Sequence, residues 1–136
     1  MSTVAASVSA LYAAILGLLA ATLTVRVILC RVRTGVQAGD GGNAQLAQAI
    51  RAHANLAEQA PLALLLMVLA EVAGAPAIVV HSLGVVLVVA RLANAWGLSR
   101  SLGATQPRQA GAGLTVLVVV ASSLVILYRL LIAHAA

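Results

Sequence analysis

Long apolar segments separated by short polar ones dominate the pattern of the 136-residue chain. The first, from Ser2 to Val25, has no charged residue and is longer than the roughly 20 apolar residues that a membrane helix needs. Three similar segments follow, and together the four predict helices over about 3–29, 44–73, 77–98 and 110–133. The pattern therefore predicts an all-α, integral membrane four-helix bundle that forms a single domain over 1–136.

The polar connections show where these helices are expected to begin and end. In the glycine-rich loop 33–43, the segment Asp40-Gly41-Gly42 has turn chemistry, and Asn43 can cap the helix that follows. The second connection, Gly74-Ala75-Pro76, is short and uncharged, whereas the third, over about 99–109, is polar. At about 1.5 Å per residue, the second helix would reach roughly 45 Å, enough to cross a bilayer and project beyond it.

Composition excludes several classes of protein. Hydrophobic residues make up 62% and charged residues 8%, whereas soluble domains carry roughly 25% charged residues. A soluble enzyme and a disordered chain are both excluded, and continuous apolar runs replace the alternation of a membrane β-barrel. The net charge of +5 comes from arginines between or inside apolar segments, so we expect no nucleic-acid partner. The single cysteine, Cys30, allows no disulfide within the chain.

Arginine placement predicts the orientation in the membrane. Arg26, Arg31 and Arg33 follow the first apolar segment, and Arg100 and Arg108 lie between the third and fourth helices, whereas the N-terminal tail and the 74–76 turn carry none. By the positive-inside rule, the two longer loops are expected in the cytoplasm and both termini outside. Because the positive charge follows the first apolar segment, we expect a retained anchor rather than a signal peptide.

The first half of the second helix carries the candidate site. Arg51, Asn55 and Glu58 are spaced i, i+4, i+7 and fall within roughly 40° of one another on a helix. Such groups at membrane depth should face protein or water. Two interpretations stay open: a structural polar seam, or a site for a zwitterionic ligand, because arginine binds carboxylates and glutamate accepts from an ammonium. On the third helix, Arg91 and Asn94 share a face, and Arg91 is expected either to pair with Glu58 or to join the same site.

Three segments resemble a known family. The stretch from Gly35 to Pro61, with Arg51, Asn55 and Glu58, resembles the signature of the small bacterial branch of the MAPEG family, the membrane-associated proteins in eicosanoid and glutathione metabolism. Segment Arg91–Gly97 is similar to the family's third-helix motif, and Arg108–Thr115 to the start of its fourth helix. The resemblance implies an inner-membrane homotrimer that takes glutathione as co-substrate and a lipophilic electrophile from the bilayer, with no metal.

The resemblance also implies roles for individual residues. Glutathione would lie at subunit interfaces on the cytoplasmic side, where Arg108 would be the catalytic residue that stabilises its thiolate. The residues that would bind glutathione are Arg51, Asn55 and Glu58, together with Arg31 from a neighbouring subunit, and Arg91 and Asn94 on the opposite wall.

Three positions depart from the family pattern. Catalytic members often carry tyrosine directly after the second-helix glutamate, where this chain has Gln59. On the third helix, they carry a histidine or tyrosine followed one turn later by a tyrosine, where this chain has Asn94 and Leu98. The expected function is a glutathione-dependent transferase or peroxidase. The alternative is a non-enzymatic protein of the same fold, a lipid-binding scaffold or partner-binding subunit. A small multidrug transporter is disfavoured, because the first helix lacks a carboxylate.

Overall fold

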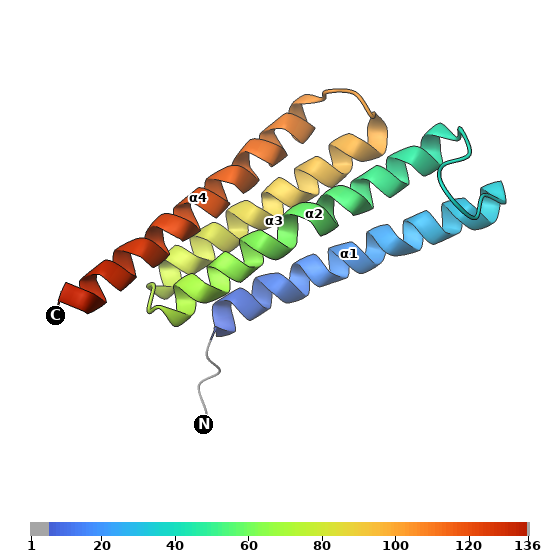
Figure 1. Ribbon diagram of the computed structural model, residues 1–136. Helices are drawn as coiled ribbons and strands as arrows, with labels where there is room; N and C mark the ends of the chain where they lie inside the picture. The colour runs from blue at the N-terminus through green and yellow to red at the C-terminus, as the bar shows by residue number, and fades with distance from the viewer. Residues whose placement is uncertain (1–5, 136) are drawn as a thin grey trace.

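Four long helices form the chain, which the computed structural model describes over residues 6–135 (Figure 1). They are α1 (Ser7–Thr34), α2 (Ala44–Val72), α3 (Ala77–Arg100) and α4 (Gln106–Ala135). All four are long and apolar enough to cross a membrane. Helices α2 and α3 occupy the centre: α1 packs on both, α4 packs on both, and α1 does not touch α4 within the described range.

Four helix ends lie outside the predicted bounds, one of them the end of α4 at Ala135, two residues past the predicted end. Helix α1 continues to Thr34, five residues past the predicted end, and closes on Gly35, which has a φ of 69° and donates its amide to the Arg31 carbonyl. Helix α3 continues to Arg100, and α4 begins at Gln106, four residues earlier than predicted. The predicted ends lie where the sequence becomes polar, but a helix can continue past that point, beyond the apolar part of the membrane. The predicted start of the first helix, at about residue 3, lies outside the described residues.

The predicted entry into α2 is confirmed. Asn43 accepts a hydrogen bond from the Leu46 amide at 3.0 Å, and Asp40 accepts one from the Gly42 amide at 3.0 Å. Gly41 and Gly42 both have positive φ, which glycine adopts without steric cost. Side-chain capping thus starts α2 directly after a tight turn.

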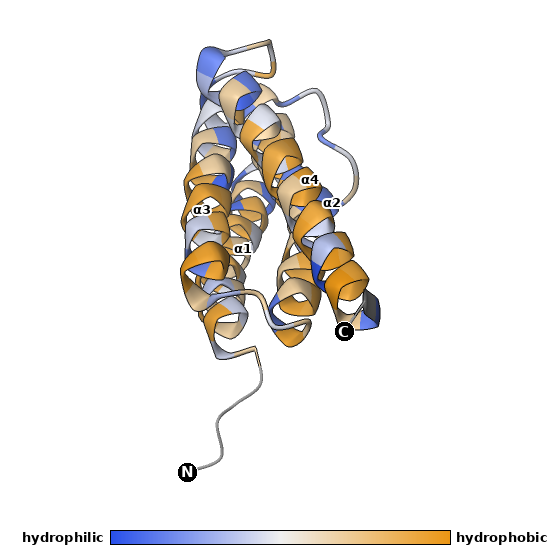
Figure 2. Cartoon of the chain, turned by 90° about the vertical axis from the view of Figure 1, so that its left-hand side faces the viewer, coloured by the Kyte–Doolittle hydropathy of each residue, from blue (hydrophilic) through white to orange (hydrophobic). Residues whose placement is uncertain are grey.

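Small residues let the central helices pack closely. The buried face of α2 is rich in alanine, including Ala49, Ala52 and Ala63, and small residues at helix contacts are typical of membrane bundles. Large aliphatic side chains point outward along all four helices, and Figure 2 shows apolar colour through their middle portions, with polar residues gathered toward the loops. This outer surface suits lipid, because it offers hydrocarbon no unpaired backbone groups.

The α2–α3 turn lies at the same end of the bundle as the start of α1 and the end of α4 (Figure 1). Here Glu71 accepts hydrogen bonds from the backbone amides of Val8 (2.9 Å) and Ser9 (2.7 Å), so a carboxylate from α2 caps α1. Arg129 donates to the carbonyl of Gly74 in the turn. The α1–α2 and α3–α4 loops meet at the opposite end, where the candidate site lies.

Candidate functional site

A charged stripe on α2 comprises Arg51, Asn55 and Glu58, as the helical period predicted. Arg51 and Glu58 form an ion pair of 3.2 Å between Nη1 and Oε1, with side chains 47% and 50% exposed. The pair therefore lies on the outer surface of the single chain, and its charged atoms are open to a further partner. Asn55 lies between them along the helix and is half-buried.

Beneath the stripe, the guanidinium of Arg91 is 2% exposed and joins three helices. It donates to Asn55 Oδ1 on α2 at 3.1 Å, to the Gly111 carbonyl on α4 at 2.9 Å, and to the Thr115 hydroxyl. The alternative prediction that Arg91 pairs with Glu58 is wrong, because Glu58 pairs with Arg51. Arg91 instead reaches the stripe through Asn55, whose side chain it fixes.

Close contact between α3 and α4 makes this network possible. Asn94, which is 3% exposed, donates its side-chain amide to the Arg108 carbonyl at 3.1 Å. A Cβ atom added to Gly111 would lie 2.5 Å from the Ala90 carbonyl oxygen. Glycine at this position therefore lets the two backbones approach and places the Gly111 carbonyl within reach of Arg91.

Arg108 and Arg31 lie at the same end of the bundle as the stripe, and each braces a loop. Arg108 donates through Nη1 to the carbonyls of Leu102 (2.7 Å) and Gly103 (3.1 Å) in the α3–α4 loop. Arg31 donates to backbone carbonyls in the α1–α2 loop, at 3.2 and 3.0 Å. Both guanidiniums thus have neutral acceptors, and within residues 6–135 neither pairs with a carboxylate.

A cleft of about 350 Å³ opens beside Arg51. Its other walls come from both loops, with Asp40 on one side and Leu102 on the other. The carbonyl of Leu102 also accepts a hydrogen bond from Arg108, so the predicted catalytic arginine is bound to one wall of the cleft although it does not line it. The sequence carries no signal that Asp40 and Leu102 belong to this site, because the two loops meet only once the helices have packed.

The residues that replace the family's aromatic side chains differ in accessibility. Gln59 is exposed next to Glu58, whereas Asn94 and Leu98 are buried. Within the described part of the chain, no group of three His, Cys, Asp or Glu side chains could hold a metal ion. The chemistry that the site offers is therefore that of guanidinium, amide and carboxylate groups.

Four membrane-length helices with a charged cleft at one end define a class of small integral membrane protein. The chain belongs to the MAPEG family, whose model matches residues 9–128. It is 40% identical over 95 residues to the inner membrane protein YecN of Escherichia coli K12, an alignment that covers 70% of this chain and 72% of the relative. The YecN protein of E. coli O6:H1 matches equally well. The helices and these relatives support an integral position in the inner membrane.

Proposed function

We propose that the protein is a glutathione-dependent transferase or peroxidase that acts on lipophilic electrophiles dissolved in the bilayer. The observation that carries this proposal is the half-exposed Arg51–Glu58 pair, of which Arg51 lines a cleft, in a member of the MAPEG family. Glutathione is a zwitterion, with carboxylates that a guanidinium binds and an ammonium that a carboxylate accepts. A ligand with both charges would exchange the ion pair within the helix for two ion pairs of its own.

The stripe also supports association between subunits with glutathione at their interfaces, and we take the number three from the family resemblance. Charged groups near membrane depth must face protein or water, because each central arginine or acid costs about 2.5–3.5 kcal/mol in lipid. In the single chain, the outer side of Arg51 and Glu58 has no protein cover over residues 6–135. We propose that a neighbouring subunit covers it and contributes Arg31. The loop end would face the cytoplasm, as the arginine distribution predicts, with both termini outside.

Arg108 is the proposed catalytic residue. Its guanidinium is bound only to neutral carbonyls among the described residues, so its charge remains available to stabilise a glutathione thiolate. A nearby cation lowers the pKa of a thiol from its usual value of about 8.5 and so raises the fraction of nucleophilic thiolate. In a transfer reaction, the thiolate sulfur would form a bond to the electrophilic carbon, and the bond to the leaving group would break.

Arg91 and Asn94 take a positioning role in this proposal. Both are buried and already bound within the chain, so we place neither in direct contact with glutathione. Arg91 holds the Asn55 side chain, and Asn94 holds the start of α4 through the Arg108 carbonyl. Their contribution is to fix the Asn55 side chain and the start of α4, which carries Arg108.

Calorimetric titration of glutathione into the detergent-purified protein tests the proposal. We expect saturable binding that Arg51→Ala and Glu58→Gln each abolish, together with conjugation of glutathione to an aryl halide that Arg108→Ala abolishes while binding persists. Melting temperatures of all variants establish that each is folded. Absence of glutathione binding in the wild-type protein, or binding that neither stripe variant weakens, would overturn the proposal.

The second candidate is a non-enzymatic protein that uses the same fold as a lipid-binding scaffold or partner-binding subunit. It is favoured by Gln59, Asn94 and Leu98, because the two third-helix positions are buried and offer the cleft no hydroxyl or ring. The variant Gln59→Tyr separates the two functions. A scaffold gains no glutathione binding from this change, whereas a transferase binds glutathione before it and more tightly after it.

A further inference from the structure

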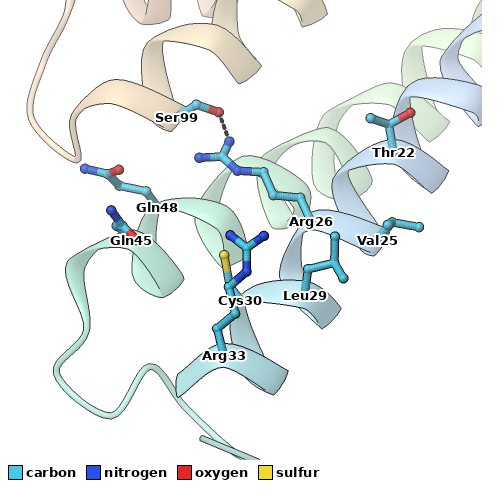
Figure 3. Close-up of a pocket in the computed structure, with 9 residues that line it drawn as sticks. All are labelled: Thr22, Val25, Arg26, Leu29, Cys30, Arg33, Gln45, Gln48 and Ser99. Atoms are coloured by element: carbon cyan, nitrogen blue, oxygen red, sulfur yellow. Dashed lines mark hydrogen bonds between the residues drawn. The ribbon is translucent and has the colours of Figure 1, made fainter. Parts of the chain in front are cut away.

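A second cleft, of about 500 Å³, lies at the loop end of the bundle between α1, the start of α2 and the end of α3. Figure 3 shows its polar lining: the guanidiniums of Arg26 and Arg33 from α1, the amides of Gln45 and Gln48 from α2, and the Ser99 hydroxyl from α3. None of these residues belongs to the charged stripe. The cleft is thus a separate polar site, which shares no lining residue with the cleft beside Arg51.

The charge in this cleft is positive and uncompensated. Arg26 donates to Ser99, which is neutral, and Arg33 makes no hydrogen bond within the described residues. The chain has three acidic residues in all, and each lies elsewhere: Glu58 pairs with Arg51, Glu71 caps α1 at the opposite end, and Asp40 lines the cleft beside Arg51. Two guanidiniums that face one cavity without a carboxylate favour an anion there.

Apolar residues beside the two arginines indicate which kind of anion the cleft fits. Arg26 and Arg33 are seven residues apart on α1, about 10 Å along the helix axis. The apolar residues Val25 and Leu29 line the same cleft, and both are about half exposed on the outer surface of α1. The cleft therefore combines a cationic end with an apolar side that opens toward lipid.

We propose that this cleft binds the phosphate headgroup of an anionic phospholipid, with an acyl chain along Val25 and Leu29. Arg33 lies beyond the apolar part of α1, at the level of the headgroups, and Arg26 lies nearer the hydrocarbon, so a phosphate between them contacts both. Gln45 and Gln48 add amide donors from α2. Basic pockets between membrane helices bind anionic headgroups in this way. This site does not depend on the glutathione function proposed above.

Cys30 makes the proposal directly testable, because it lines the cleft and is the chain's single cysteine. The full-length protein is placed in phosphatidylcholine vesicles with or without phosphatidylglycerol, and the rate of maleimide labelling of Cys30 is measured. We expect phosphatidylglycerol to slow labelling, and we expect Arg33→Gln to weaken its apparent affinity about fivefold. Comparing the two lipids within each variant removes any effect of the substitution on the reactivity of the thiol itself.

Arg100→Gln is the matched control, because it removes one positive charge at the same end of the bundle without lining this cleft. We expect it to leave the protection of Cys30 unchanged. If Arg100→Gln and Arg33→Gln lose the protection of Cys30 equally, the proposal is overturned in favour of a general attraction between the positive surface and anionic lipid. Equal labelling in both lipids would overturn it too. So would protection by inorganic phosphate, or by S-methylglutathione (whose blocked thiol cannot consume maleimide), in phosphatidylcholine vesicles that matches protection by phosphatidylglycerol.

Discussion

Gly111 allows the close contact between α3 and α4, so its replacement by alanine is the sharpest test of the fold around Arg91. The added Cβ would lie 2.5 Å from the Ala90 carbonyl oxygen and 3.0 Å from the backbone nitrogen of Asn94. The first distance is about 0.9 Å shorter than ordinary contact at 3.4 Å. Both of these neighbours are backbone atoms, which cannot rotate away. Helix α4 must therefore move outward, which also lengthens the hydrogen bond from Arg91 to the Gly111 carbonyl.

The expected cost follows from two opposing effects. Overpacking of this kind costs about 1–3 kcal/mol, while alanine in a helix gains up to about 1 kcal/mol over glycine. With the full propensity gain, we expect Gly111→Ala to lower the free energy of unfolding by about 0–2 kcal/mol, or up to about 10 °C in melting temperature for a chain of this length. Relative to a glycine-to-alanine change that gains the same propensity without overpacking, the expected loss is about 1–3 kcal/mol. The measurement is the fraction of detergent-solubilised protein that remains folded after heating, assayed by size-exclusion chromatography.

Gly113, two residues further along the same helix, provides the matched control. A Cβ added there would meet no atom within 4 Å, so Gly113→Ala gains helix propensity without steric cost. We expect it to be neutral or stabilising. If Gly111→Ala melts at the same temperature as Gly113→Ala, then α3 and α4 do not approach as described, and the argument for Arg91 as a link between three helices fails.

Three further predictions concern other contacts between helices and at helix ends. Gly84→Ala should destabilise the protein by about 1–3 kcal/mol, because the new Cβ would overlap the Tyr12 ring; the same heating assay checks this, and Gly84→Ala combined with Tyr12→Leu should recover part of the loss. Glu71→Gln should destabilise it by about 1 kcal/mol, because it weakens two hydrogen bonds to the start of α1; hydrogen exchange at the first turn of α1 should rise, and unchanged exchange would refute the capping role. Asn43→Ala should lower the free energy of unfolding by about 1 kcal/mol. Hydrogen exchange at the Leu46 amide should become faster, whereas Asn43→Asp, which retains the cap, should leave it unchanged.

The helices and their faces could be predicted from the sequence because both depend on local pattern. Apolar length fixes the number of spans, and the 100° turn per residue correctly placed Arg51 and Glu58 on one stripe. The cap at Asn43 was also foreseeable, since its partner is three residues away. The end of α1 and the start of α4 could not be predicted in this way, because a rise in polarity marks the membrane boundary and need not end a helix.

Contacts between helices could not be predicted in the same way. Helical period shows which side of α3 carries Arg91, but not that α4 presents the Gly111 carbonyl and the Thr115 hydroxyl to it. Likewise, nothing near Glu71 in the sequence indicates that it caps a helix more than 60 residues earlier. Such partners are set by helix rotation and crossing, which depend on packing along the whole contact.

The place of Arg91 in the bundle has a consequence for biogenesis. Helix α3 must enter the bilayer with a guanidinium about 14 Å from its C-terminal end, and a central arginine opposes insertion by about 2.5–3.5 kcal/mol. Two of its three hydrogen-bond partners lie on α4, which the ribosome makes after α3. The third segment therefore gains its full stability in the membrane only after the fourth has arrived, and a nascent chain truncated before Gly111 should leave the third segment poorly inserted.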